Sequence, residues 1–259
     1  MNSFRIGGIA NYKKLSILLV LALLLVLFSC SAGTNRETVH GDLQKIDSSN
    51  TSNLDLIDSR HEYIADGVSI YYPQFRLSNS SLSDCINETI RSEALGILDS
   101  FWADIATRTI EIDYSFSCVN DGIISIRFEG LAHSEEVAYP RNLFYVANVC
   151  IASGKPLKPE DIFEINVEFA ETLMRNALPV VSTQDTSDIL SHDEMELECY
   201  SALDLLEGIR EGKGVDDRIY LYLTEGTIGF NVPTLHVRGD NEFYEVGNDC
   251  IRRFIKFNT

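Results

Sequence analysis

One histidine lies within a short acidic stretch near the middle of the chain. His133 follows Glu129 by four residues and stands shortly before Glu135 and Glu136. A histidine beside carboxylates can act as a general base or as a metal ligand. A zinc site would need further ligands at suitable spacing, and the triplet at 192–194 lies on a predicted helix, where adjacent residues point in different directions. We therefore expect no metal, and the simplest interpretation of His133 is a turn histidine hydrogen-bonded to backbone.

The sequence lacks the motifs that mark common catalytic sites. It contains no Gly-x-Ser-x-Gly elbow, no His-Glu-x-x-His pair, no P-loop and no Gly-x-Gly-x-x-Gly loop. We expect a protein that is not an enzyme and that carries no cofactor. The alternative is a cell-wall hydrolase or deacetylase-like enzyme with a site near His133. In the binding hypothesis, His133, Glu129 and Glu135 are candidate ligand contacts.

Cys30 is the residue with the most specific chemistry in the sequence. It follows three basic residues and an apolar run of 14 residues at 15–28, the arrangement of a signal peptide. The run is shorter than the ~20 residues that a spanning helix needs. Residues 27–30 resemble the bacterial lipobox, in which the cysteine thiol receives a diacylglycerol and becomes the new first residue. An uncleaved signal anchor is the alternative, and both interpretations place the rest of the chain outside the cytoplasm.

The charge balance restricts the partners. The chain has 21 Lys and Arg against 39 Asp and Glu, and removal of the first 29 residues takes away three basic residues and no acidic one, which leaves a net charge near −21. Such a surface repels nucleic acid and anionic lipid. We expect no nucleic-acid partner, membrane attachment through the lipid on Cys30, and a basic protein or a cell-wall glycan as the partner. An acidic surface that serves solubility alone is the simpler alternative.

The other cysteines indicate no metal or redox motif. They are scattered, odd in number and without Cys-x-x-Cys spacing, so a disulfide framework is excluded, whereas a single disulfide outside the cell is left open. Each lies in an apolar pattern typical of a small buried residue. They are Cys85, Cys118, Cys150, Cys199 and Cys250.

Residue patterning divides the chain into four segments. Residues 1–29 are the expected signal peptide, and residues 30–60 are polar without a sustained period, which predicts a flexible tether that reaches about 30 Å from the membrane. The rest is expected to form a first subdomain at 61–120 (strand, helix, strand) and a second at 121–259. About 200 residues are enough for one large domain or two small ones.

Periodicity predicts an α+β fold with mainly antiparallel sheets in these two adjoining subdomains. Apolar residues spaced by three and four indicate a helix at 82–106, opened by a capping box at 81–84. Strict alternation around Asn120-Asp121-Gly122 indicates a β-hairpin. Hairpins outnumber crossovers in this order of elements, which favours antiparallel pairing. The expected strands are 68–73 (ended by Pro73), 110–118, 124–128, 143–151 (central), 218–224, 227–232 and 241–246 (edge), and the expected helices after the first are 159–163, 169–177 and the acidic 188–211.

Several short motifs resemble a pair of adjoining domains of unknown function that are common in secreted Gram-positive proteins. The motif Tyr72-Pro73-Gln74, followed by Ile86-Asn87 on a helix, is similar to the first domain. The second is similar at 124–129, 132–133, 143–146, 153–157, 160–163, 220–224 and 226–230. Together they resemble the extracytoplasmic half of lysozyme-sensing anti-sigma factors and the amino-terminal part of certain peptidoglycan deacetylases.

This resemblance covers most of residues 63–246 and implies fold, location and a binding or sensing role near the cell wall. It does not imply chemistry, and the segment before His133 lacks the paired glycines that the family usually has there. From these observations we expect a non-catalytic lipoprotein on the extracytoplasmic face of the cell membrane that binds a protein or a cell-wall ligand. The alternative is a structural module without a dedicated ligand.

Overall fold

A computed structural model gives the fold. The residues that it describes all belong to the compact unit Arg36–Thr259. No helix among them has both the length and the apolar character needed to cross a bilayer. The expected signal peptide, Cys30 and Glu135 lie outside the described residues. The described residues are 38–40, 57–101, 108–120, 122–134, 138–180, 196–211 and 218–257.

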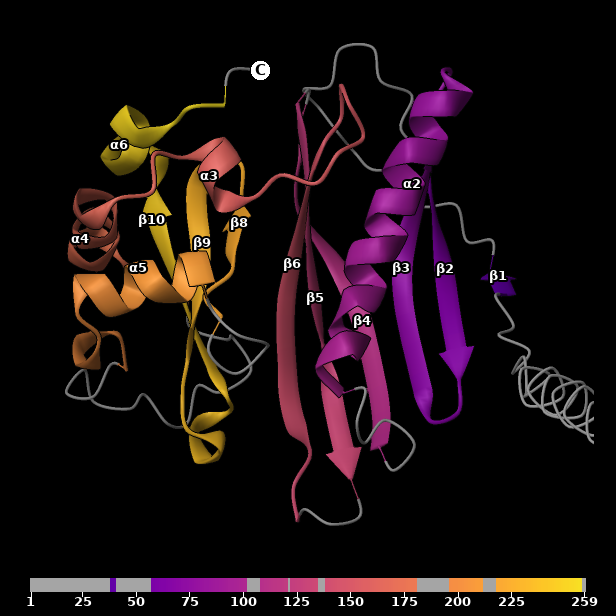
Figure 1. Ribbon diagram of the computed structural model, residues 1–259, viewed down its shortest axis with the longest axis horizontal. Coiled ribbons are helices and arrows are strands. Elements are labelled where there is room, and N and C mark those ends of the chain that lie inside the picture. Colours follow the sequence, from indigo (N-terminus) through magenta and orange to yellow (C-terminus); the bar gives the residue numbers. More distant parts are fainter. Residues whose placement is uncertain are drawn as a thin grey trace, which may run out of the picture. The chain divides into compact units, whose positions relative to one another are not determined.

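Six strands form the larger sheet, in the spatial order β1-β2-β3-β4-β5-β6 (Figure 1). Neighbouring strands are antiparallel except β3 and β4, which run parallel over Val68–Ile70. The crossover between these two strands is made by the helix α2 (Ser80–Leu95) and the 3-10 turn η1 (Gly96–Phe101). The strands are β1 (Thr38–His40), β2 (Ile57–Ala65), β3 (Val68–Arg76), β4 (Arg108–Val119), β5 (Ile123–Ser134) and β6 (Arg141–Cys150).

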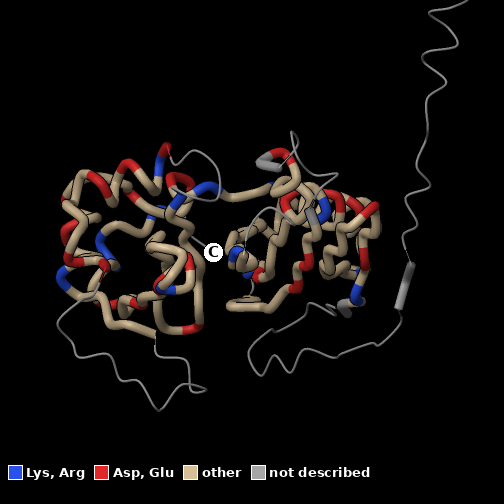
Figure 2. Tube along the Cα trace, turned by 90° about the horizontal axis from the view of Figure 1, so that it is seen from below, with Lys and Arg blue, Asp and Glu red and all other residues tan. Residues whose placement is uncertain are grey.

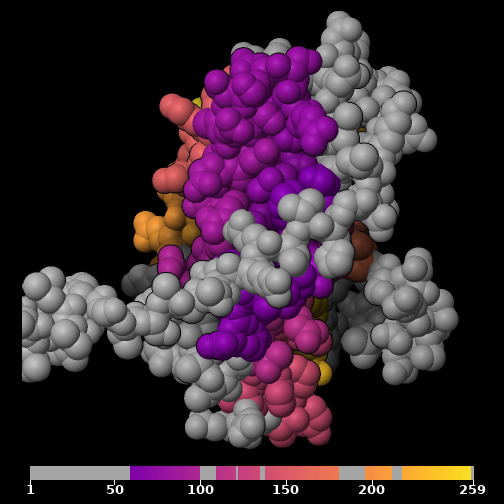
Figure 3. Space-filling model, turned by 90° about the vertical axis from the view of Figure 1, so that its right-hand side faces the viewer, coloured from indigo at the N-terminus to yellow at the C-terminus, as the bar shows by residue number. Residues whose placement is uncertain are grey.

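Helix α2 covers one face of this sheet because its apolar residues form a single stripe. Ile86, Ile90 and Ala94 recur every fourth residue and are fully buried. Burying an isoleucine side chain contributes about 1.5–3 kcal/mol. The helix begins one residue before the predicted capping box, because the side chain of Asn79 accepts a hydrogen bond from the Leu82 amide at 3.2 Å. Helix α2 lies on the molecular surface (Figure 3), and its exposed residues include Ser81, Asp84, Cys85, Glu88, Ser92 and Glu93.

Four strands form the smaller sheet, in the order β7-β10-β9-β8. All its pairings are antiparallel, and the predicted hairpin around Glu225 and Gly226 joins β8 to β9. Together the two sheets confirm the α+β class with mainly antiparallel pairing. The strands are β7 (Leu178–Pro179), β8 (Leu221–Leu223), β9 (Thr227–Pro233) and β10 (Asn241–Gly247), and the helical segments of this part are α3 (Pro159–Ile162), α4 (Val167–Asn176), η3 (Glu196–Cys199), α5 (Ala202–Glu211), η4 (His236–Arg238), α6 (Asn248–Ile251) and η5 (Arg252–Phe254).

Two hydrophobic cores divide the described residues. The first core draws its buried residues from 68–151, between α2 and the larger sheet, and the second draws them from 162–254, between the smaller sheet and its helices. The change from one core to the other falls between Ile151 and Ile162. The boundary predicted at residue 120 lies at the turn of the β4–β5 hairpin, inside one sheet.

The structure also differs from the expected elements at the start of the chain. Strand β1 and the first residues of β2 fall within the segment 30–60, which was expected to be a tether. Pro73 does not end its strand but pairs opposite Arg60. Proline is tolerated there because the pairing of β3 with β4 is confined to Val68–Ile70, so β3 has a single neighbour at that point.

Three later elements depart from prediction as well. The described part of the acidic helix expected at 188–211 consists of η3 and α5, and residues 188–195 lie outside the described part. Strand β10 is not an edge strand, because the two residues of β7 pair with its outer side. The long helix expected at 82–106 is α helix only as far as Leu95 and continues as η1 to Phe101.

Strand β6 was expected at the centre of its sheet, yet it lies at the edge. Its apolar residues alternate between two covered faces, and this explains the nearly continuous apolar run at 143–151. Leu143 and Tyr145 point into the first core. On the opposite face, the Phe144 ring meets the ring of Phe243 edge-on at 4.8 Å and that of Tyr222 at 6.1 Å. The smaller sheet thus packs against β6, and a strand buried on both faces was mistaken for a central one.

Candidate functional site

The residues singled out from the sequence do not converge in the described structure. His133 lies on β5 opposite Thr109 with its side chain exposed. Glu129 is on the same strand and the same face, but four residues of strand separate the two by about 13 Å. The Glu129 carboxylate accepts a hydrogen bond from Arg127 Nε at 2.9 Å. Glu135 lies outside the described residues, so the expected trio is not seen together.

The described residues also hold no group of three or more His, Cys, Asp or Glu side chains that could hold a metal ion. The five cysteines that the structure describes are all free, and the prediction that they are buried is wrong for Cys85, Cys199 and Cys250, which are exposed. Acidic residues are spread along the helices and both sheets rather than gathered on one element (Figure 2). A site must therefore be sought elsewhere.

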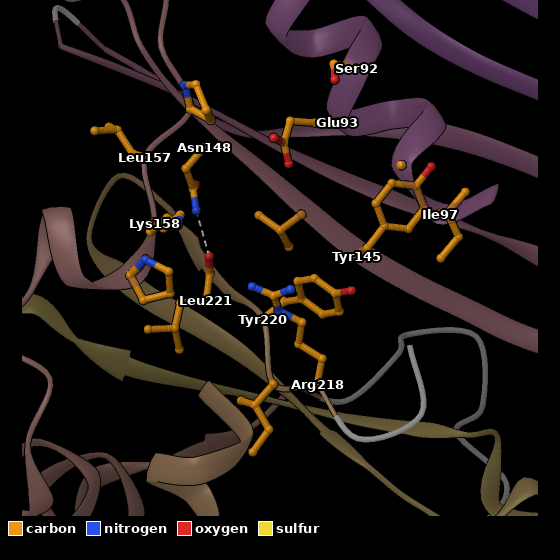
Figure 4. Close-up of a pocket in the computed structure, with 15 residues that line it drawn as sticks. Ser92, Glu93, Ile97, Tyr145, Asn148, Leu157, Lys158, Arg218, Tyr220 and Leu221 are labelled. Atoms are coloured by element: carbon orange, nitrogen blue, oxygen red, sulfur yellow. Dashed lines mark hydrogen bonds between the residues drawn. The ribbon is translucent and has the colours of Figure 1, made fainter. Parts of the chain in front are cut away.

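A pocket of about 520 Å³ opens beside the edge strand β6. One wall is the last turn of α2 with the start of η1, and the opposite wall is the segment that leads into β8. The floor is β6, and the loop before α3 closes one end (Figure 4). The residues lining it are Ser92, Glu93, Gly96, Ile97, Tyr145, Val146, Asn148, Pro156, Leu157, Lys158, Pro159, Arg218, Ile219, Tyr220 and Leu221.

Three charged groups from three separate elements meet in this pocket. Glu93 comes from α2, Lys158 from the loop before α3, and Arg218 from the segment before β8. Partial burial of its carboxyl raises the pKa of Glu93, although the residue as a whole is exposed and the charges of Arg218 and Lys158 act to lower that pKa. Glu93 has no hydrogen-bond or ion-pair partner among the described side chains. The pocket therefore carries one more positive than negative charge, in contrast to a chain whose net charge is −18.

Two tyrosines form the rigid part of the walls. The Tyr145 hydroxyl donates a 2.6 Å hydrogen bond to the carbonyl of Ala94, and burial raises the pKa of Tyr145 well above its ordinary value. Its ring stacks on Phe128 at 4.8 Å. Burial also raises the pKa of Tyr220, whose ring centroid lies 5.5 Å from the guanidinium carbon of Arg218. Both phenols are thus neutral at physiological pH, and Tyr145 fixes the end of α2 against β6.

Asn148 links β6 to the smaller sheet and leaves one polar atom without a partner. Its Nδ2 donates a 2.9 Å hydrogen bond to the carbonyl of Leu221. Its Oδ1 is buried and has no hydrogen-bond partner in the described part of the chain. An unsatisfied buried acceptor costs about 1–3 kcal/mol. Because Oδ1 is closed off from solvent, a ligand donor would reach it only if the Asn148 side chain turned toward the pocket.

Sequence reasoning did not find this pocket. Glu93 occupies the polar side of a predicted helix, Lys158 lies just before another predicted helix, and Arg218 stands at the start of a predicted strand. Each position resembles an ordinary solvated charge, because only the packing of the smaller sheet against β6 brings the three together. The apolar run at 143–151, interrupted only by Asn148 despite its edge position, was a signal that a second layer covers this strand.

Comparisons with known proteins identify no family for this chain. No protein-family model and no curated protein matches the sequence. Among solved structures, a DUF3298 family member from Bacteroides fragilis is 12% identical, with a TM-score of 0.49, and the match covers 81% of this chain and 96% of that one. A DUF3298 family protein from Pseudomonas aeruginosa is 11% identical, with a TM-score of 0.42, over 79% of this chain and 94% of that one. These structural neighbours are domains of unknown function.

Proposed function

We propose that this chain is a non-catalytic lipoprotein of the extracytoplasmic membrane face that binds a cell-wall or protein ligand in the pocket beside β6. One observation carries the proposal. The buried Asn148 Oδ1 has no hydrogen-bond partner among the described residues, and Glu93, Lys158 and Arg218, which come from three separate elements, stand in the same pocket. Concave sites with a few converging polar groups are where proteins usually bind small ligands.

The location in this proposal comes from the sequence. A basic segment, an apolar run and Cys30 form the order of a lipoprotein signal. Two acyl chains on one cysteine give stable membrane attachment where a single chain would be reversible. Since a lipid anchor has no cytoplasmic end, a bound ligand is captured or passed on outside the cell, which favours binding over signalling.

The test is a binding measurement on the mature chain carrying Cys30→Ala, so that no lipid complicates the titration. Muropeptides released from peptidoglycan and lysozyme, as a basic protein, are titrated separately by calorimetry. Arg218→Ala should weaken binding about tenfold or more, because hydrogen bonds to charged groups contribute about 1.5–3 kcal/mol. Arg252→Ala is the matched control, since Arg252 is an exposed arginine paired with Asp249 on α6.

The outcomes separate the pocket from the other candidates. Binding that is lost in Arg218→Ala and retained in both Arg252→Ala and His133→Ala supports the proposal. Lysozyme binding that weakens steeply with salt, yet is indifferent to Arg218→Ala, assigns the interaction to the acidic surface instead. Release of products from wall fragments that disappears in His133→Ala would show an enzyme and overturn the proposal.

A further inference from the structure

The edge of β6 is open where it passes the pocket. In an antiparallel sheet, alternate residues of an edge strand direct their backbone groups away from the neighbouring strand. The carbonyl of Asn148 points outward, because it accepts a 2.7 Å bond from the Leu157 amide. The amide of Asn142 also points outward, because it donates a 2.7 Å bond to Asp240 Oδ2. Val146 lies two residues before Asn148 and four residues after Asn142. By this alternation it also directs its N–H and C=O outward.

Val146 finds no partner for these two groups in the described part of the chain. Strand β6 pairs with β5 on its other side only, and the loop at 155–157 covers the outer edge no further than Asn148. Val146 and Asn148 both line the pocket. Proteins usually cover or blunt an exposed edge strand, because its free N–H and C=O groups invite pairing with another chain. Here the open edge lies at the floor of a pocket with charged walls.

We infer that the pocket takes an extended peptide that pairs with the edge of β6 and carries a carboxylate. The inference rests on the proposed function and names its ligand class. Backbone groups of the peptide would bond the outward N–H and C=O of Val146. Arg218 and Lys158 offer two positive charges to a carboxylate at the peptide's end. Pairing at an exposed edge, with pockets or charges that select the sequence, is a recurrent mode of peptide recognition.

The walls favour a peptide over a glycan. A sugar ring typically stacks on a free aromatic face. The rings of the two pocket tyrosines already contact other side chains. The Tyr145 ring stacks on Phe128. The Tyr220 ring lies beside the guanidinium of Arg218 at 5.5 Å and meets Phe144 edge-on. The groups that remain available in the pocket are charged side chains and backbone hydrogen-bonding groups. These complement the charges and backbone groups of a peptide.

The experiment begins with selection from a random octapeptide library displayed with free carboxyl termini, against the mature chain carrying Cys30→Ala. The tightest binder is then synthesised in three forms: with a free carboxylate, with a terminal amide, and with all its backbone amides N-methylated. Fluorescence anisotropy gives each Kd. The amide form should bind about tenfold or more weakly, and the N-methylated form at least tenfold more weakly, because both lose hydrogen bonds that the free peptide makes.

Two protein variants locate the peptide. Arg218→Ala should abolish the preference for the free carboxylate, so that the acid and amide forms bind alike. Val146→Pro removes the outward N–H without removing a bond to β5, and it should weaken binding several-fold, whereas Val146→Ala keeps the N–H and serves as its control. If Val146→Pro does not fold, the N-methylated peptide still tests strand pairing against the unaltered protein.

The possible results are distinct. Binding that requires the carboxylate, the peptide N–H groups and Arg218 supports the inference. Failure to select any peptide, or equal affinity for the N-methylated form, overturns it. In that event, muropeptides or glycan fragments that still bind in an Arg218-dependent manner would leave the proposed function standing. If no ligand of any class depends on Arg218, the proposed function fails too.

Discussion

Gly229 in β9 leaves the space in which the Tyr222 ring of the smaller sheet packs against β6. It pairs with Tyr222 of β8, whose ring lies flat over the glycine. A Cβ at position 229 would fall well inside van der Waals contact with two ring carbons of Tyr222 and 2.5 Å from its hydroxyl oxygen. Tyr222 is fully buried and packs against Phe144, so it cannot swing away without cost.

From this geometry, Gly229→Ala should destabilise the protein by about 3 kcal/mol, the upper part of the usual range for overpacking a core. In a domain of this size that loss corresponds to a fall of about 6–12 °C in Tm. Thermal and urea unfolding followed by circular dichroism measure it. Gly226→Ala in the same hairpin is the control, since no atom lies within 4 Å of a Cβ there. Its effect should stay within about 0.5 kcal/mol.

A double-mutant cycle with Tyr222→Ala isolates the cause. Tyr222→Ala alone should cost about 3–5 kcal/mol, as for other buried aromatics. In that background Gly229→Ala should be neutral or stabilising by up to about 1 kcal/mol, because an alanine has less conformational entropy to lose in a strand. The reasoning is refuted if Gly229→Ala is as mild as Gly226→Ala, or if its cost is unchanged once the Tyr222 ring is gone.

Three further predictions concern the pocket, the loop beside α2 and the anchor. Burial raises the pKa of Glu93 above its ordinary value of 4.5, so its ionisation in the folded state costs stability as pH rises through that raised pKa. Glu93→Gln should therefore raise Tm at neutral pH, by a margin that vanishes below about pH 4.5; an equal margin at both pH values would contradict this. Gly154 has φ +67° and lies against Cys85, so Gly154→Ala should cost about 1–3 kcal/mol in urea unfolding, whereas an unchanged midpoint would disprove the close contact. Cys30→Ala should abolish incorporation of labelled palmitate and move the protein out of the membrane fraction, and retention of the label would refute lipidation at this residue.

Local patterns were enough to predict much of the fold. The stripe of Ile86, Ile90 and Ala94 predicted α2 because a one-sided apolar face is a property of the helix itself. The hairpin at Asn120 followed from turn chemistry, and the structure shows the Asn120 side chain accepting bonds from the amides of Gly122 and Ile123. Class and strand pairing could be predicted because both depend on residues close together in sequence.

What depends on packing between distant segments could not be predicted. The parallel pairing of β3 with β4 requires a crossover of more than thirty residues, and no local signal specifies it. The edge position of β6 could not be read from its sequence. A strand face covered by another sheet has the same apolar composition as a strand face covered by a helix. Glu93, Lys158 and Arg218 are unremarkable until those contacts bring them together. His133, which the sequence singles out, is exposed on strand β5.

The most direct test of the account maps the bound ligand onto the structure. Backbone amide shifts of the isotope-labelled mature chain are recorded by NMR as muropeptides, or the selected peptide, are added. The account predicts that the largest shifts cluster at Glu93, Val146 and Arg218, with residues around His133 unchanged. Saturable shifts centred on β5 near His133, with none along the edge of β6, would contradict the assignment of the pocket as the binding site.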